Sequence, residues 1–163
     1  MRWRFGDFAI IGTKVFAQAR LKEDTMADIV GGCLCGNVRY SSGAEPAMTA
    51  VCHCSHCQKQ TSSAFSILVA VPKGSLQIEG EPLAAYETEG ESGQPLIRKF
   101  CPNCGSGIVT DVTVTPDLEW IKAGTLDDTS WLHPQVHWWC DSAQPWVKLD
   151  EAVPAFAGNP PLG

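Results

Sequence analysis

The sequence has no block of lysine and arginine residues, no long apolar run and no sustained helical periodicity. Twelve Lys and Arg residues stand against eighteen Asp and Glu residues, which gives a formal net charge of -6 and a pI near 5.1. Nucleic-acid binders typically carry a basic patch, so this charge balance argues against nucleic acid as a partner. No apolar run reaches the roughly 18 to 20 residues that a membrane-spanning helix needs. We therefore expect a soluble protein with no membrane partner.

The first 26 residues also lack the pattern of a secretory signal peptide. Asp7 and Lys14 interrupt their apolar residues, and no small-residue cleavage site follows. The eight cysteines could form four disulfides in a small secreted scaffold, but that interpretation needs such a signal. An arginine-bearing transit peptide is a further alternative. We expect instead a cytoplasmic protein in which residues 1–25 are an N-terminal extension outside the folded core and residues 26–163 form the domain.

The remaining sequence predicts a single, mainly β domain of short antiparallel strands. A chain of 163 residues is long enough for one domain with a sizeable core. Nine short segments are rich in β-forming residues and are bounded by Gly, Pro, Ser or Glu. They are residues 37–41, 48–53, 64–71, 76–80, 84–88, 96–100, 107–114, 118–124 and 135–139. The only helical pattern is one turn over residues 55–61.

Four of the eight cysteines form two closely spaced pairs, Cys33 with Cys35 and Cys101 with Cys104. Four thiolates are enough to close a tetrahedral zinc site with no position left for water. One pair lies just before a predicted strand and the other just after one, so a zinc ion would link distant segments and stabilise the fold. A redox CxxC motif is the alternative, but its usual βαβ context is missing.

A second group of cysteines, Cys52, Cys54 and Cys57, lies in the stretch "CHCSHC". It offers three thiolates and no obvious fourth. A zinc site with three protein ligands and one open position is typical of catalytic centres. Buried or redox-labile thiols are the alternative interpretation. The odd number of cysteines therefore favours a catalytic zinc.

The four histidines and the eighth cysteine are weaker candidates for ligands. In an extended segment His53 would point away from the flanking cysteines, which predicts an exposed or hydrogen-bonded side chain. His56 is a candidate for a proton-handling group beside the metal. His133 and His137 lie in a tryptophan-rich segment and are expected to be packed side chains. Cys140 is expected to be a buried free thiol.

Five blocks in this order resemble the glutathione-dependent formaldehyde-activating enzyme family, which also includes centromere protein V. The blocks are "GGCLCGNVRY", "CHCSHCQKQTSSAFS", "FCPNCGSGI", "IKAGTLDD" and "HPQVHWWCDSAQPW", and they extend over about residues 30–158. The resemblance implies a zinc-stapled β-tent fold with two zinc ions per chain. It assigns the structural zinc to Cys33, Cys35, Cys101 and Cys104, and the active-site zinc to Cys52, Cys54 and Cys57.

The activity that this resemblance implies is that of a carbon–sulfur lyase. Such an enzyme joins a small thiol, by default glutathione, to an aldehyde, by default formaldehyde, and gives S-hydroxymethylglutathione. No redox cofactor is needed for this step. Three thiolates around one zinc leave the centre negatively charged, which weakens it as a Lewis acid. Binding the substrate thiol is therefore a better expected role for the metal than strong activation of the carbonyl group.

The sequence departs from the family pattern at Ser62, where many members have glycine, and we expect this residue to reshape the pocket wall. The carboxylates of glutathione would require nearby cations. The basic residues closest to the motifs are Lys59, Arg98 and Lys99, and each is expected to be a solvated surface charge. The five tryptophans between residues 120 and 146 could line an apolar substrate wall, but we expect them to pack as an aromatic core.

Two other functions remain open. The same zinc chemistry could act on a different thiol or electrophile. Alternatively, the domain could be a non-catalytic zinc module that binds another protein, because a fold does not settle a function.

Overall fold

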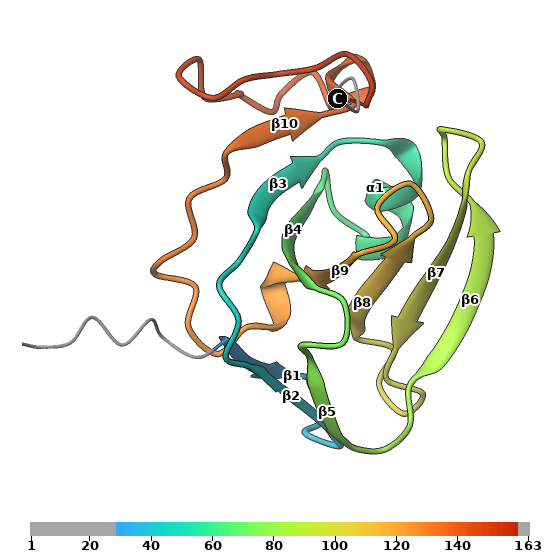
Figure 1. The fold of residues 1–163 in the computed structure, drawn as a ribbon. Helices are drawn as coiled ribbons and strands as arrows, with labels where there is room; N and C mark the ends of the chain where they lie inside the picture. Colours follow the sequence, from blue (N-terminus) through green and yellow to red (C-terminus); the bar gives the residue numbers. More distant parts are fainter. Residues whose placement is uncertain (1–28, 160–163) are drawn as a thin grey trace, which may run out of the picture.

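The computed structural model describes residues 29–159, so the predicted N-terminal extension of residues 1–25 lies outside the described residues. The described part folds into strands arranged in two sheets, with one short α-helix and two 3-10 turns (Figure 1). In chain order the elements are β1 (Ile29–Gly32), β2 (Val38–Ser42), β3 (Met48–Cys52), α1 (Ser55–Thr61), β4 (Ser66–Pro72), β5 (Gln77–Gly80), β6 (Ala84–Glu89), β7 (Pro95–Phe100), β8 (Gly107–Val112), β9 (Leu118–Lys122), η1 (Ala123–Thr125), β10 (Val136–Trp138) and η2 (Cys140–Ser142). All nine predicted strands and the predicted helical turn are therefore confirmed.

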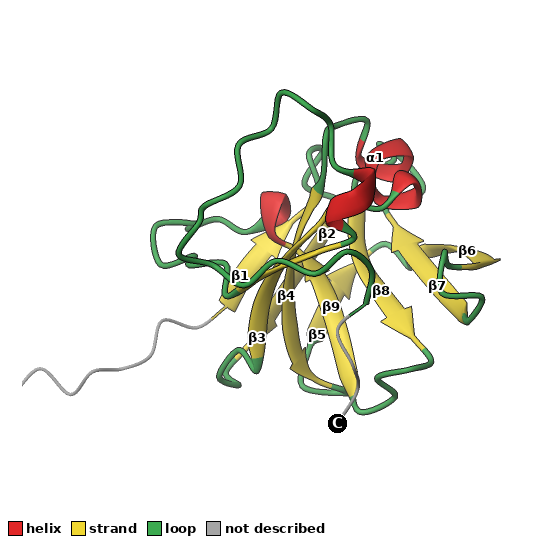
Figure 2. Ribbon diagram, turned by 90° about the horizontal axis from the view of Figure 1, so that it is seen from above, coloured by secondary structure: helices red, strands yellow, loops and turns green. Residues whose placement is uncertain are grey.

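The two sheets differ in size. The smaller has the order β1-β2-β5, and the larger has the order β10-β3-β4-β9-β8-β7-β6. In Figure 1 the large sheet curves around α1, and the small sheet lies across one end of it. Figure 2 shows α1 beside one end of the strands, with connecting loops at both ends. The mainly β, single-domain fold predicted from the sequence is confirmed.

One strand pair departs from the predicted antiparallel arrangement. β10 pairs with β3 in parallel, with Val136 opposite Ala50, whereas every other pair of named strands is antiparallel. A parallel pair needs a long crossover connection rather than a hairpin. The chain between β3 and β10 supplies that connection, since it passes through β4 to β9 before it returns to the edge of the sheet.

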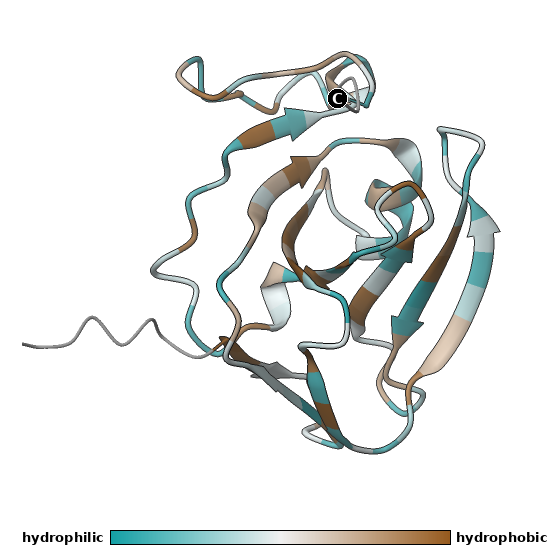
Figure 3. Ribbon diagram, viewed as in Figure 1, coloured by the Kyte–Doolittle hydropathy of each residue, from teal (hydrophilic) through white to brown (hydrophobic). Residues whose placement is uncertain are grey.

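Two hydrophobic cores lie on opposite faces of the large sheet. β4 is buried on both faces, and its side chains alternate between them as strand geometry requires. Val69 and Val71 join the core between the two sheets, whereas Leu68 and Ala70 join the core on the other face. Figure 3 accordingly shows hydrophobic colour over most of β3 and β4, while β6 at the sheet edge is largely pale or hydrophilic. Each core receives one of the two cysteine groups.

β1 was not predicted, because its sequence "IVGG" combines two residues that favour strands with two glycines that disfavour them. Tertiary packing explains the glycine at position 31. A Cβ atom there would lie 2.3 Å from the hydroxyl oxygen of Tyr40 and 2.3 Å from the carbonyl oxygen of Thr125. Only glycine allows this close approach.

The helices of the described part are short. α1 has seven residues, and the two 3-10 turns have three each. Within residues 29–159, no helix has the length and apolar character needed to cross a bilayer.

Candidate active site

Seven cysteines gather into two groups in space, and the groups are those predicted from the spacing. Within each group the sulfur atoms all lie within 4.8 Å of one another. Cys33 and Cys101 belong to the core between the sheets, and Cys52 and Cys54 belong to the core on the other face of the large sheet. The two groups therefore occupy separate environments, and each could hold its own metal ion.

The four-cysteine group is built from two tight turns. Cys33 and Cys35 follow β1, and Cys101 and Cys104 follow β7. The Sγ atom of Cys35 lies 3.4 Å from that of Cys33 and 3.8 Å from that of Cys101. Zinc binds thiolates at about 2.3 Å in a tetrahedron, which separates the sulfur atoms by about 3.8 Å. The sulfur spacing therefore fits a zinc ion.

In the four-cysteine group the pKa values of Cys33 and Cys104 are lowered, which favours their thiolates, whereas the pKa of Cys101 is raised to about 11. The backbone N–H of Val38 donates to Cys33 Sγ at 3.2 Å. Cys104 Sγ lies 3.3 Å from the hydroxyl oxygen of Ser106, and hydrogen bonds from Ser106 lower the pKa of Cys104 to about 5. Because a metal binds cysteine as the thiolate, these donors prepare the group for a cation.

The three-cysteine group lies where β3 leads into α1. Cys52 ends β3, and Cys54 is the N-cap of α1. The sulfur of Cys54 accepts a hydrogen bond from the backbone N–H of Cys57 at 3.3 Å, so helix capping holds these two side chains together. Hydrogen bonds with Cys52 and Cys54, aided by the positive charges of Lys122 and Arg98, lower the pKa of Cys57 to about 3. The same coupling raises the pKa of Cys52.

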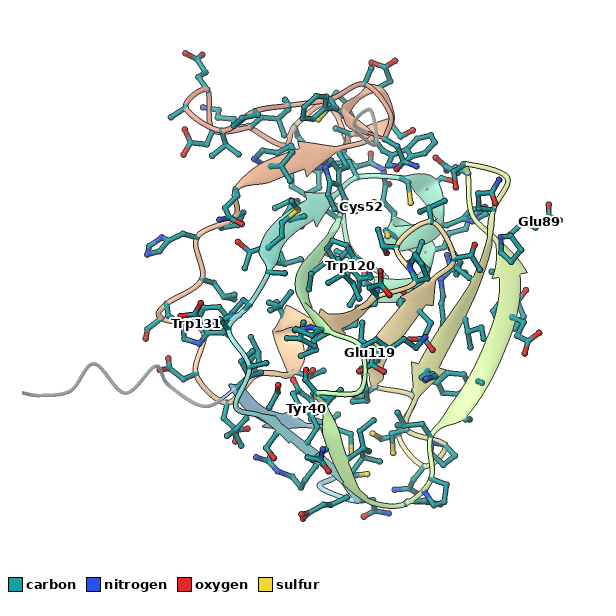
Figure 4. All side chains as sticks on the ribbon, in the orientation of Figure 1. Tyr40, Cys52, Glu89, Glu119, Trp120 and Trp131 are labelled. Carbon is teal, nitrogen blue, oxygen red and sulfur yellow. The ribbon has the colours of Figure 1, made fainter. Side chains whose placement is uncertain are left out.

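The three-cysteine group opens onto a cavity of about 440 Å³. Figure 4 shows Cys52 and Trp120, which come from β3 and β9, near one another inside the arc of the large sheet. The tryptophans of the cavity wall are Trp120, Trp138 and Trp139, and aliphatic side chains such as Leu68 and Leu96 complete it. The cavity therefore has an end with three cysteines that could hold a metal ion, and an apolar, aromatic wall.

The predicted packing is confirmed for Trp120, Trp138 and Trp139, which belong to the core on this face of the sheet, and the same three also form the cavity wall, which was the alternative interpretation. Trp120 is both buried and part of the cavity wall, because the alternation of β9 directs its side chain to the same face as Cys52. Trp131 does pack against the core between the sheets, as predicted. Trp146 is 71% exposed and belongs to neither.

Two buried cations also line the cavity, and the prediction for one of them was wrong. Arg98 on β7 is only 8% exposed, although it was expected to be a solvated surface charge. Lys99, the next residue, has the opposite orientation, and its ammonium group pairs with Asp111 at 2.7 Å. The strand register explains this difference. Arg98 lies opposite Thr110 on β8, and Thr110 lies opposite Trp120 on β9, so all three side chains are on the cavity face of the sheet.

Lys122 is the second buried cation, and it was not among the residues predicted for the site. It is 7% exposed, and its Nζ donates a hydrogen bond to the hydroxyl oxygen of Ser66 at 3.2 Å. Burial lowers the pKa of Lys122, while the neighbouring cysteines act in the opposite direction. In the sequence, only its position at the end of a buried strand could have indicated that Lys122 is buried. Lys59, in contrast, is exposed as predicted.

Comparison with known proteins identifies the family. The model of the family described as "Glutathione-dependent formaldehyde-activating enzyme" matches residues 28–142. The chain belongs to this family. No curated protein matches the chain. A crystal structure of a Rhodobacter sphaeroides protein is similar in fold, with a TM-score of 0.50 and 20% sequence identity over 63% of this chain and 92% of that one.

In this member of the glutathione-dependent formaldehyde-activating enzyme family, the histidines have different environments. His53 is fully buried, and its Nε2 shares a hydrogen bond of 3.0 Å with Nδ1 of His137. The hydrogen-bonded role predicted for His53 is thus confirmed, and the exposed alternative is wrong. Burial lowers the pKa of both rings. His137 is packed as predicted, but His133 is exposed, because its loop runs outside both cores. His56 is half-buried and lines the cavity.

Three further residues of this family member lie in or near these sites. Glu91, which the sequence analysis missed, lines the cavity, and its carboxylate accepts a hydrogen bond from the backbone N–H of Ser55 at 2.8 Å. Cys140 is a free, half-buried thiol outside both cysteine groups, and burial raises its pKa. Ser62 lines a different surface depression, next to Cys104, and not the cavity at the three-cysteine group as expected.

Proposed function

We propose that this protein is a zinc-dependent carbon–sulfur lyase that forms or cleaves the adduct between glutathione and formaldehyde, S-hydroxymethylglutathione. Cys33, Cys35, Cys101 and Cys104 would hold a structural zinc ion, and Cys52, Cys54 and Cys57 an active-site zinc ion. The observation that carries the proposal is the contrast between the groups. Four sulfurs complete one tetrahedron, whereas three sulfurs open onto a 440 Å³ cavity.

A zinc ion on the three-cysteine group would supply a position at which a substrate thiol is bound and oriented as its thiolate. The chain's own residues provide the surroundings. Lys122 is buried beside the cysteine thiolates and offsets their negative charge, and Arg98 makes a smaller contribution. The tryptophan wall gives the cavity an apolar lining, and a low local dielectric would strengthen electrostatic interactions with a bound substrate.

The proposed step balances without a redox cofactor. The sulfur of the thiol forms a bond to the carbonyl carbon, the C=O double bond becomes a C–O single bond, and the proton lost by the thiol ends on that oxygen. His56 lines the cavity, and one of its ring nitrogens is the group proposed to carry this proton. Cleavage of the adduct is the same step in reverse.

The test is adduct formation by purified protein. Glutathione and formaldehyde are mixed with zinc-loaded protein, with zinc-stripped protein and with no protein, and the hydroxymethyl resonance is followed by NMR exchange spectroscopy. We expect the zinc-loaded protein to accelerate exchange well above the uncatalysed reaction and the stripped protein to lose this effect. Equal exchange in all three samples would contradict the proposal.

A second candidate is the same zinc chemistry on a different thiol or electrophile. The aromatic wall favours it, because formaldehyde is far smaller than a 440 Å³ cavity with three tryptophans. A panel of larger aldehydes in the same assay distinguishes the two candidates. A cytoplasmic location is part of the proposal, since all eight cysteines are free and reduced thiols are typical of the cytosol.

A further inference from the structure

Arg98 is a buried cation that lacks an acidic partner within the described residues. It is 8% exposed, yet the ion pairs in residues 29–159 involve Arg39, Lys73 and Lys99 instead. A buried charge without a partner is costly, so a side chain of this kind is usually kept for a ligand or for a nearby charge. The Cys57 sulfur is one nearby charge, but Lys122 already lies beside it.

Arg98 also lies between two cavities. It lines the 440 Å³ cavity at the three-cysteine group and a neighbouring groove of about 360 Å³. The other residues of the groove are His56, Lys59, Gln60, Tyr86 and Thr88. No acidic side chain lines this groove, and Lys59 adds a second positive charge to it. In the larger cavity the one carboxylate, Glu91, accepts hydrogen bonds from Ser55. A negatively charged group in the groove would therefore meet cations and little repulsion.

We propose that Arg98 binds a carboxylate of the thiol substrate and so selects thiols that carry a carboxylate arm, with the sulfur at the three-cysteine group and the arm in the groove. This inference rests on the proposed function, because it assumes that the larger cavity takes a thiol. A guanidinium group is suited to the role, since its planar donors match both oxygens of a carboxylate.

Lys122 is less suited to the same role. Its Nζ already donates to Ser66, and it lies on β9, two strands away from Arg98 on β7. Strands are about 4.8 Å apart, so the two positions are separated by about 10 Å across the sheet. This separation lets Lys122 stay with the cysteine sulfurs, while Arg98, which also lines the groove, contacts a carboxylate that extends from the sulfur toward the groove.

The first experiment compares glutathione with its diethyl ester, which has the same thiol but no free carboxylate. Zinc-loaded parent protein, Arg98→Met and Arg98→Lys are measured with formaldehyde, and Lys99→Met serves as the matched control on the opposite face of β7. Arg98→Met should raise the KM for glutathione by about 10- to 100-fold, the size of a lost charge-assisted contact, with kcat changed less than about threefold. The KM for the diester should change less than about threefold. Arg98→Lys should lie between parent and Arg98→Met, and Lys99→Met should match the parent.

Two results would overturn the assignment. One is an equal loss with glutathione and the diester in Arg98→Met, particularly with a fall in zinc content, because Arg98 would then support the metal centre. The other is equal affinity of the parent protein for glutathione and the diester, a result that would contradict the assignment without measurements on any variant.

Calorimetric titration of glutathione into each zinc-loaded protein, without aldehyde, separates this inference from the proposed function. If the parent makes no adduct with any thiol, the proposed function fails. Weaker glutathione binding by Arg98→Met than by Lys99→Met would still support the role of Arg98, and equal binding would reject it.

Discussion

At the scale of single residues, Ser62 holds a backbone conformation that is costly for an L-amino acid. Its φ is 51° and its ψ is 37°, in the left-handed region, because it is the C-cap of α1. Its backbone N–H donates to the carbonyl oxygens of Gln58 and Lys59 at the end of the helix. Glycine adopts this conformation without steric cost and is the residue most often found at such a position.

We therefore predict that Ser62→Gly stabilises the protein by about 1 kcal/mol relative to the control Ser63→Gly. Both changes add similar freedom to the unfolded chain, but only Ser62 has a positive φ, so the difference reports the relief of strain. Chemical denaturation of the zinc-loaded proteins gives both free energies of unfolding. Equal values for the two variants would show that the strain is absorbed elsewhere.

Single residues also show what the sequence could and could not predict. The cysteine groups were predicted because tetrahedral coordination needs a definite number of ligands at short spacings. The orientations of Arg98 and Lys99 were not predicted. Which of these two adjacent side chains faces the cavity depends on the pairing register of β7 with β8. Lys122 was missed for the same reason, since its burial follows from its place between β4 and β8 in the sheet.

At the scale of elements, the two cysteine groups should differ in how much structure depends on them. Cys54 caps α1, and serine is also a good N-cap, so Cys54→Ser removes a thiolate but keeps an acceptor for the N–H of Cys57. Cys101 is fully buried in the core between the sheets, and its backbone shapes a turn through hydrogen bonds with Gly105 and Ser106.

We predict that Cys101→Ser loses several kcal/mol of stability, on the order of a lost structural metal, and gives insoluble or poorly packed protein. Cys54→Ser should fold cooperatively but lose activity and about one of two zinc ions. Thermal melts and elemental analysis check both, with Cys140→Ser, outside both groups, as the control that stays near the parent. Similar behaviour of the first two variants would require the two roles to be reassigned.

The strands were predictable where turn-forming residues bound a β-rich segment, as in β4 and β7. β1 was not, because the close approach of Gly31 to Tyr40 is a tertiary contact. The parallel pairing of β10 was missed too, because it joins segments more than 80 residues apart and no local pattern records it.

At the scale of the whole molecule, the large sheet separates the four-cysteine group from the three-cysteine group. The four-cysteine group lies with the core between the sheets and joins the turn after β1 to the turn after β7. The three-cysteine group lies with the other core and faces the cavity. Under the proposed assignment, a metal ion on one side of the sheet would stabilise the fold while an ion on the other side exchanges ligands.

This separation predicts that the two zinc ions leave the protein in order. A chelator can enter the cavity and attack an ion held by three thiolates directly. An ion held by four thiolates becomes accessible only when the turns that carry these cysteines open. Fully loaded protein should contain about two zinc ions per chain, and mild chelation should leave about one with the fold intact. Elemental analysis and circular dichroism on the same samples measure both quantities. Cys54→Ser is the matched control, because it should begin with about one ion and lose little of it under the same treatment. Loss of both ions together, with unfolding, would mean that the two groups do not form separate classes of site, and the proposed catalytic role of the three-cysteine group would lose its support.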